Sequence, residues 1–445
     1  MAAVRNRLTY LLAAIALTAP AAAAGQGPGA LRLTLEDAQA RAVESSHRLA
    51  EARAREAAAQ AVVASRAAAD LPIVSAAAGY TRTNHVTPFI VPGPTGLPQV
   101  LYPDVPDNYR TRLDLQWPIY TGGRSDALER AARAEAAAVA AEVVVARAEL
   151  QLEVARAFWA VVTAGATASV LEQGVSRAQA HVADARERFN AGLVPPNEIA
   201  SAEAQVARAR MLLIEARNQR DVSLADLSRL AGLEPAAAAI EPAAALDAAA
   251  GPVAPSAALL DEARGARGER RAIERRIEAA DEQLAATAAS RRPVIAVAGG
   301  IDYARPNAKI FPRRDVWQES WDVGVNVGWT LWDGGRSAAD TAASASLATA
   351  ARLRLEEFDS ILAVEVRQRT LDIDAGRAAV AAADETIRAA AEARRVVTER
   401  YRAGVGTQIE VLDAEFALLQ SELDRTRALA GVRLAEARLA RALGR

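Results

Sequence analysis

Cysteine is absent from this sequence of 445 residues. The chain therefore has no disulfide, no thiolate metal site and no cysteine nucleophile. A lipid-anchored N-terminus is excluded as well, because lipoprotein acylation needs a cysteine. Histidine is also scarce, and His47, His85 and His181 lie far apart in the sequence without the spacing of metal ligands. We expect no metal site and no cofactor.

Aromatic residues make up only 4% of the chain, and Lys309 is its only lysine. The formal net charge of -2 offers no basic excess to neutralise phosphates, so no nucleic-acid partner is expected. Alanine dominates instead, and it has the highest helix propensity of all residues. This composition favours long, closely packed helices over a thick aromatic core.

The N-terminus has the pattern of an export signal. Two early arginines precede a short apolar run over residues 8–17, and an Ala-Ala-Ala cleavage site ends at Ala24. The run is too short for a membrane-spanning helix. We predict a signal peptide over 1–24, with an uncleaved anchor as the alternative. No later stretch approaches 18 uninterrupted apolar residues, so any membrane span is expected to be β.

The second half of the chain repeats the first. The segment Trp117–Ser125 matches Trp329–Ser337 at an offset of 212 residues, and the same offset aligns Arg188–Gly192 with Arg400–Gly404. Further upstream the offset is 221, so the first copy carries nine extra residues before Trp117. We predict a first structural repeat over 25–232, a linker over 233–255 that is irregular, and a second repeat over 256–445.

Each repeat is predicted to run helix, strand, strand, long helix, turn, helix. The first repeat has a helix over about 34–70 with Thr34 as N-cap, strands at about 71–84 and 109–121, a long helix over 122–190 and a helix over 197–231. The second repeat has strands at about 293–303 and 320–332, a long helix over 335–402 and a helix over 408–443. A loop rich in proline and glycine, about 85–108, separates the first two strands.

The predicted strands alternate between apolar and polar residues. Trp321, Val323 and Val325 point one way, while Asp322 and Asn326 point the other. A period of two over about ten residues is typical of a transmembrane β-strand. A half-buried strand of a soluble sheet is the alternative.

Four strands cannot close a barrel, and an open sheet edge cannot face lipid. Two chains would supply eight strands and three chains twelve. Side chains fill an eight-stranded barrel, whereas the small and polar inward residues favour an open lumen. We therefore expect a homotrimer in contact with outer membrane lipid.

Taken together, these features resemble the TolC-like outer membrane efflux family. The resemblance rests on the signal peptide, the tandem repeat, the Gly-Gly-Arg motifs at 122–124 and 334–336, and above all Ala403–Ala414, which is close to the family's second periplasmic turn. It implies a mixed α and β membrane protein with a trimeric 12-stranded barrel and a 12-helix periplasmic tunnel. It also implies a gate at the tunnel's periplasmic end, and two partners: a periplasmic adaptor and an inner-membrane transporter.

The resemblance also implies gate residues at the helix turns. Asn197 with Glu198 matches the family's first-turn pair, and Glu410 with Asp413 matches the acidic pair at the tunnel entrance. The turn residues are Gly192, Gly404, Gly406 and Thr407. Threefold symmetry would turn each acidic residue into a ring that attracts cations. Alternatively, Glu198 and Glu410 only complement a helix N-terminus.

The first and second turns depart from the family pattern. Gly406 occupies a position where the namesake of the family has an arginine that helps to latch the gate. Pro195 and Pro196 stiffen the first turn. The details of the latch are therefore left open by the sequence.

Four aromatic residues, Trp117, Tyr120, Trp329 and Trp332, precede the Gly-Gly motifs. Amphipathic rings favour the headgroup level of a bilayer, so we predict a girdle on the periplasmic side of the barrel. Packing between barrel and helices is the alternative. Quenching of single-tryptophan variants by lipids brominated near the headgroup separates the two, and no quenching at any position would count against a girdle.

The predicted function is a passive outer membrane export duct of a tripartite efflux or type I secretion system. A periplasmic coiled-coil adaptor or structural protein is the alternative, but an adaptor would carry compact β-domains and no duplicated strand pair. An enzyme is not expected, because the carboxylates lie at helix-surface spacing beside arginines and no hydrolase, phosphate-loop or metalloprotease motif is present. The cargo, whether drugs, metal cations or proteins, is left open.

Overall fold

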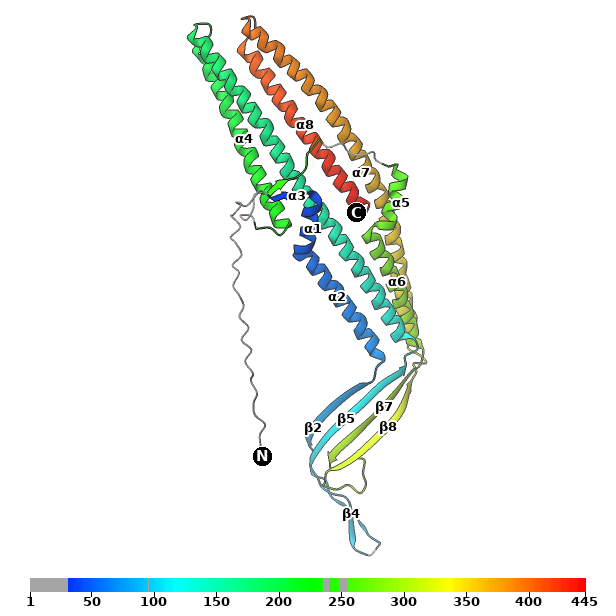
Figure 1. Ribbon diagram of the computed structural model, residues 1–445. Coiled ribbons are helices and arrows are strands. Elements are labelled where there is room, and N and C mark those ends of the chain that lie inside the picture. Colours follow the sequence, from blue (N-terminus) through cyan, green and yellow to red (C-terminus); the bar gives the residue numbers. More distant parts are fainter. Residues whose placement is uncertain (1–30, 95, 235–239, 248–253) are drawn as a thin grey trace, which may run out of the picture.

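The computed structural model describes residues 31–94, 96–234, 240–247 and 254–445. The predicted signal peptide lies outside these residues, as does part of the predicted linker. Figure 1 shows an elongated chain with a β-sheet at one end and helix tips at the other. The sheet and the tips are thus separated by the whole length of the helices.

The sheet has four antiparallel strands in the order β2-β5-β7-β8. They are β2 (Ile73–Arg82), β5 (Asp107–Tyr120), β7 (Val294–Arg305) and β8 (Gln318–Gly328). The central pair β5–β7 joins the two repeats. Within the described residues the outer edges of β2 and β8 have no partner strand.

The register of the sheet separates an apolar face from a polar face, as the alternation predicts. Leu113, Ile301 and Trp321 form one row across β5, β7 and β8, and they are 47%, 57% and 74% exposed. The neighbouring row, Arg112 with Asp302, faces the other way. An apolar face this open in the single chain is suited to lipid, and the opposite, polar face is suited to water.

The helices form two matched sets. The long helices α3 (Arg124–Asn190) and α7 (Arg336–Arg402) have 67 residues each, and α4 (Pro196–Leu230) and α8 (Gln408–Ala442) have 35 each. A 67-residue helix is about 100 Å long. The shorter helices α2 (His47–Ala67) and α6 (Gly268–Ala288) also lie along α3 and α7. Each long helix is thus flanked by two shorter ones in succession (Figure 1).

Among the described residues, α3 is the one helix long and apolar enough to cross a membrane, with a mean hydropathy of 1.5 in its most apolar window. Core helices of soluble proteins pass the same test. The window is 44% buried within the chain, and α3 packs along α4, α6 and α8. Its apolar residues therefore serve helix packing.

The helix predicted over 34–70 is in fact two helices and a 3-10 turn. α1 (Leu35–Ser45) begins at the predicted N-cap, where Thr34 accepts a hydrogen bond from the Asp37 amide. The break falls at Ser46, whose hydroxyl caps α2 by accepting from the Leu49 amide. In the second repeat the break between α5 (Ser256–Ala266) and α6 falls at Arg267, at the same offset of 221. Arg267 makes no side-chain cap, so the capping hydroxyl of Ser46 stabilises the start of α2 but is not required for the break.

The linker predicted as irregular contributes a strand. β6 (Ile240–Pro242) pairs in parallel with β1 (Leu31–Leu33). Leu33 is 1% exposed and belongs to a core with Phe158 and Leu227. This small sheet therefore fastens the N-terminal segment to the middle of the helices.

Two strand predictions need correction. The loop predicted over 85–108 contains a hairpin of β3 (Phe89–Pro92) and β4 (Pro98–Tyr102). The strand predicted over 320–332 ends at Gly328, because its partner β7 begins at Val294, the residue paired with Gly328. Trp329 and Trp332 therefore lie beyond the sheet.

Candidate gate at the helix tips

Two glycine turns close the ends of the helix pairs. Gly192 and Gly404 have φ values of 72° and 77°, a conformation that glycine adopts without steric cost. The amide of Leu193 donates to the Arg188 carbonyl at 2.9 Å, and the amide of Val405 donates to the Arg400 carbonyl at 3.0 Å. These bonds cap the last carbonyls of α3 and α7, so that α4 and α8 turn back along them.

The two tips are held together by a buried tyrosine. Tyr401, near the end of α7, is 4% exposed, and its hydroxyl donates to Glu198 Oε2 on α4 at 2.8 Å. The side chain of Gln408, at the start of α8, donates to the Glu198 carbonyl at 2.7 Å. Glu198 thus receives hydrogen bonds from both helices of the second pair.

Arg188 makes the second connection between the tips. Its Nη1 donates to the Tyr401 carbonyl at 3.0 Å, and its guanidinium lies 4.4 Å from the centre of the Tyr401 ring. Cation–π contacts of this kind are favourable, more so when shielded from water. We call Arg188, Glu198, Tyr401 and Gln408 the latch cluster, since they join the α3–α4 pair to the α7–α8 pair.

The electrostatics favour the protonated hydroxyl of Tyr401. Burial, and then the hydrogen bond to Glu198, raises the pKa of Tyr401 to about 12, so that its hydroxyl remains a donor at neutral pH. The ring of His181 lies 5.9 Å from that of Tyr401, and burial lowers the pKa of His181. The described residues contain no group of three or more potential metal ligands.

The other predicted gate residues lie apart from the latch cluster. Thr407 caps α8 by accepting from the Glu410 amide at 3.4 Å, and the Glu410 carboxylate is 4.0 Å from Arg400 Nη1. Within the described part of the chain, Glu410 Oε2 has no hydrogen-bond partner. Asn197 and Asp413 are exposed. The structure therefore brings Glu198 into contact with Gln408. It does not bring Glu198 into contact with the acidic pair Glu410 and Asp413.

Sequence reasoning missed Tyr401 and Arg188. Tyr401 is equivalent to Phe189 of the first repeat, which is 41% exposed and has no hydroxyl. That difference at equivalent positions of the two repeats was a signal available in the sequence. A repeat comparison shows what the two copies share, whereas a contact between the copies depends on where they differ.

The predicted girdle residues lie where the sheet joins the helices. Trp117 donates its indole N–H to the Asp70 carbonyl, and Trp329 donates to the equivalent Arg291 carbonyl, both at 3.1 Å. Tyr120 is 45% exposed and Trp332 is 86% exposed. The tryptophans therefore fasten each strand pair to its helix, and their position at the headgroup level stays a prediction.

A sheet with an exposed apolar face, continued by long helix pairs, defines a channel-forming membrane protein. The chain belongs to the outer membrane efflux protein family, whose family model matches residues 39–233 and 259–445. The two matched segments correspond to the internal repeat, whose boundaries stay a prediction. No curated protein matches this chain.

Solved structures of outer membrane channels share the fold. OprN matches with a TM-score of 0.77 at 19% identity, covering 92% of this chain and 89% of its own. VceC of Vibrio cholerae matches with a TM-score of 0.76 at 22% identity, covering 92% and 96%. CusC matches with a TM-score of 0.78 at 16% identity, covering 95% of both chains.

Family membership confirms the predicted function and location. The protein is an outer membrane efflux channel with a periplasmic helical part, and its family is one of channels rather than enzymes. The alternative of a periplasmic adaptor finds no support.

Proposed function

We propose that three copies of this chain form one closed channel, a twelve-stranded barrel continued by a twelve-helix tunnel. The observation that carries the proposal is the four-stranded sheet with both edges unpaired within the described residues and its apolar face open. An open edge in lipid leaves backbone groups unsatisfied at several kcal/mol each. Pairing β8 of one copy with β2 of the next removes every edge.

The even number of strands in the sheet supports this closure. Its strands alternate in direction, so that β2 and β8 run in opposite directions. We call the junction between β8 of one copy and β2 of the next the seam. Copies related by rotation therefore pair antiparallel at each seam, like the strands within each copy. The geometry closes at any copy number, and the open lumen favours three over two.

The helix tips form the gate in this proposal. The latch cluster draws the α7–α8 pair toward the α3–α4 pair, which narrows the tunnel entrance. Asn197, Glu198, Glu410 and Asp413 would then ring the entrance, three of each. An inner-membrane transporter and a periplasmic adaptor would engage these tips, and breaking the latch contacts would open the entrance. The transporter selects the cargo, which enters the barrel passively.

Disulfide trapping across the seam tests the closure, because the chain has no cysteine of its own. Ala77 pairs with Arg112 and so lies on the polar face of the sheet, which is the inward face of the proposed barrel. Ala77→Cys on β2 therefore faces inward. It is combined with one inward residue of β8 at a time, Ser320→Cys, Gly324→Cys or Asn326→Cys. Cysteines join only when their Cα atoms are within about 7 Å, so we expect one combination to give a covalent trimer on a denaturing gel.

Ala77→Cys with the outward Val325→Cys is the matched control, and it should stay monomeric on the same gel. Covalent dimers without trimers from every inward pair would contradict a ring of three.

A further inference from the structure

The inward face of the sheet carries a charged cluster near the end farthest from the helices. Asp302 of β7 has a side chain only 3% exposed, and it accepts from Arg110 Nε at 2.6 Å and from Arg112 Nη1 at 2.5 Å. Arg112 also lies 2.9 Å from Asp322 of β8. These pairs join three adjacent strands on one face.

Gly300 makes room for this arrangement. Arg112 reaches from β5 across β7 to β8, and it passes over Gly300. A Cβ atom at Gly300 would lie 2.7 Å from Arg112 Nη2, too close for any real contact. Because Gly300 has no side chain, the guanidinium can lie flat on the sheet. The arrangement of the cluster therefore depends on glycine at position 300.

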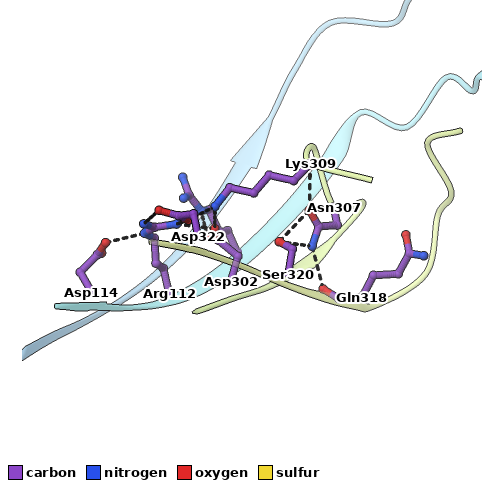
Figure 2. A network of polar contacts seen from close by, with 9 residues as sticks. Arg112, Asp114, Asp302, Asn307, Lys309, Gln318, Ser320 and Asp322 are labelled. Carbon is purple, nitrogen blue, oxygen red and sulfur yellow. Dashed lines mark hydrogen bonds and ion pairs between the residues drawn. The ribbon is translucent and has the colours of Figure 1, made fainter. Parts of the chain in front are cut away.

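The loop over 306–317, between β7 and β8, folds back onto the cluster (Figure 2). Lys309 reaches Asp302 Oδ2 at 2.7 Å and also pairs with Asp322. Asn307 is 1% exposed, donates to the Gln318 carbonyl at 3.0 Å and accepts from the Lys309 amide at 2.9 Å. The loop is therefore fixed at its start and held down at its lysine.

The same loop also holds the hairpin of the first repeat. The amide of Arg313 donates to the Leu101 carbonyl at 3.2 Å, and its side chain donates to Asn108 Oδ1 at 2.6 Å. Its guanidinium lies 5.1 Å from the centre of the Tyr102 ring. Between the loop and the inner faces of β2 and β5 lies a hollow of about 570 Å³. The loop is thus separated from β2 and β5 by this hollow and lies over the polar face of the sheet.

We propose that the loop over 306–317 is a second constriction of the channel, at the outer mouth of the barrel, and that Lys309 is the residue that holds it inward. The inference rests on the trimeric barrel proposed above, in which three such loops would meet around the axis. The three cations Lys309, Arg110 and Arg112 balance the three anions Asp114, Asp302 and Asp322. The loop also carries Arg313, Arg314 and Asp315, and the property that Lys309 would control is the width of the constriction.

Removing the charge of Lys309 should release the loop without unfolding the barrel. Asp302 keeps its pairs with Arg110 and Arg112, and Asp322 keeps its pair with Arg112. The strands therefore retain their own ion pairs. The loop loses its ion pairs with Asp302 and Asp322 and is then held by Asn307 and Arg313.

The test uses Asn326→Cys as a reporter inside the barrel. Asn326 shares the inward face with Asp322 and lies four residues nearer the helices, beneath the loop. Membrane-impermeant maleimides of increasing size are applied outside intact cells, and the labelling rate is measured. We expect Lys309→Gln to raise the rate several-fold for large maleimides and to leave it unchanged for small ones. Lys309→Arg, which keeps the charge, should match the parent.

Leu97→Cys on the β3–β4 hairpin is the control, since it is 71% exposed and should react equally in every background. If Lys309→Gln does not reach the membrane, the assembled trimer is acetylated instead. Lys309 is the only lysine, so acetylation should speed large-maleimide labelling in the parent but not in Lys309→Arg.

Rapid labelling of the parent by the largest maleimide, or equal rates with and without the Lys309 charge, would overturn the inference. Seam trapping of the same variants separates the two claims. A covalent trimer with unchanged labelling refutes the loop constriction alone, whereas loss of the trimer refutes the barrel on which it rests.

Discussion

Channels carrying Tyr401→Phe together with Glu198→Gln are expected to be open far more often than the parent. The pair removes the 2.8 Å hydrogen bond from the buried hydroxyl to a carboxylate. A hydrogen bond to a charged group contributes about 1.5–3 kcal/mol, which is roughly a 10- to 140-fold shift in the open–closed equilibrium of each tip. Single-channel recording in planar bilayers measures this as open probability and conductance.

Glu203→Gln is the matched control for the latch. Glu203 is an exposed carboxylate of the same helix, and it pairs at 2.5 Å with Arg186 inside its own helix pair. Its loss should leave gating unchanged. If the double variant gates like the parent while its trimer remains intact, the latch cluster does not hold the entrance closed.

The second large effect concerns ion selectivity. Glu410→Gln with Asp413→Asn removes two rings of three carboxylates from the proposed entrance. Charge of one sign in a narrow opening can raise the local counter-ion concentration tenfold or more. We therefore expect cation selectivity to fall toward none, and block by multivalent cations to weaken by roughly 10-fold. Reversal potentials under a salt gradient and block titrations measure the two effects.

Glu392→Gln provides the comparison, because Glu392 is an exposed α7 carboxylate paired with Arg395 at 2.7 Å. If Glu410 only complements the start of α8, the double variant should lose about 0.3–1 kcal/mol of stability and keep its selectivity. That outcome would show that neither residue lines the pore.

Much of the fold could be predicted because the repeat supplies each element twice. The offset of 212 relates α3 to α7 and α4 to α8 residue for residue. Period-two alternation identified the apolar and polar faces of the strands. The break at Ser46 was not predicted, because the helical pattern of the sequence continues through this position.

The contacts between the repeats could not be predicted. Tyr401 contacts Glu198, and Arg112 contacts Asp302, only because the helices and strands bring distant residues together. Neither the tyrosine nor the arginine is marked for such a role by its sequence context. The parallel pairing of β1 with β6 was missed for the same reason, since a three-residue strand has no period to detect.

The mass of the pore-forming particle tests the central claim most directly. The protein is solubilised, its mass is measured by light scattering with the detergent contribution removed, and the same fraction is recorded in bilayers. The account predicts three chains of 46.8 kDa each, less any cleaved signal peptide, in the particle that conducts. A stable monomer that still forms pores would contradict it.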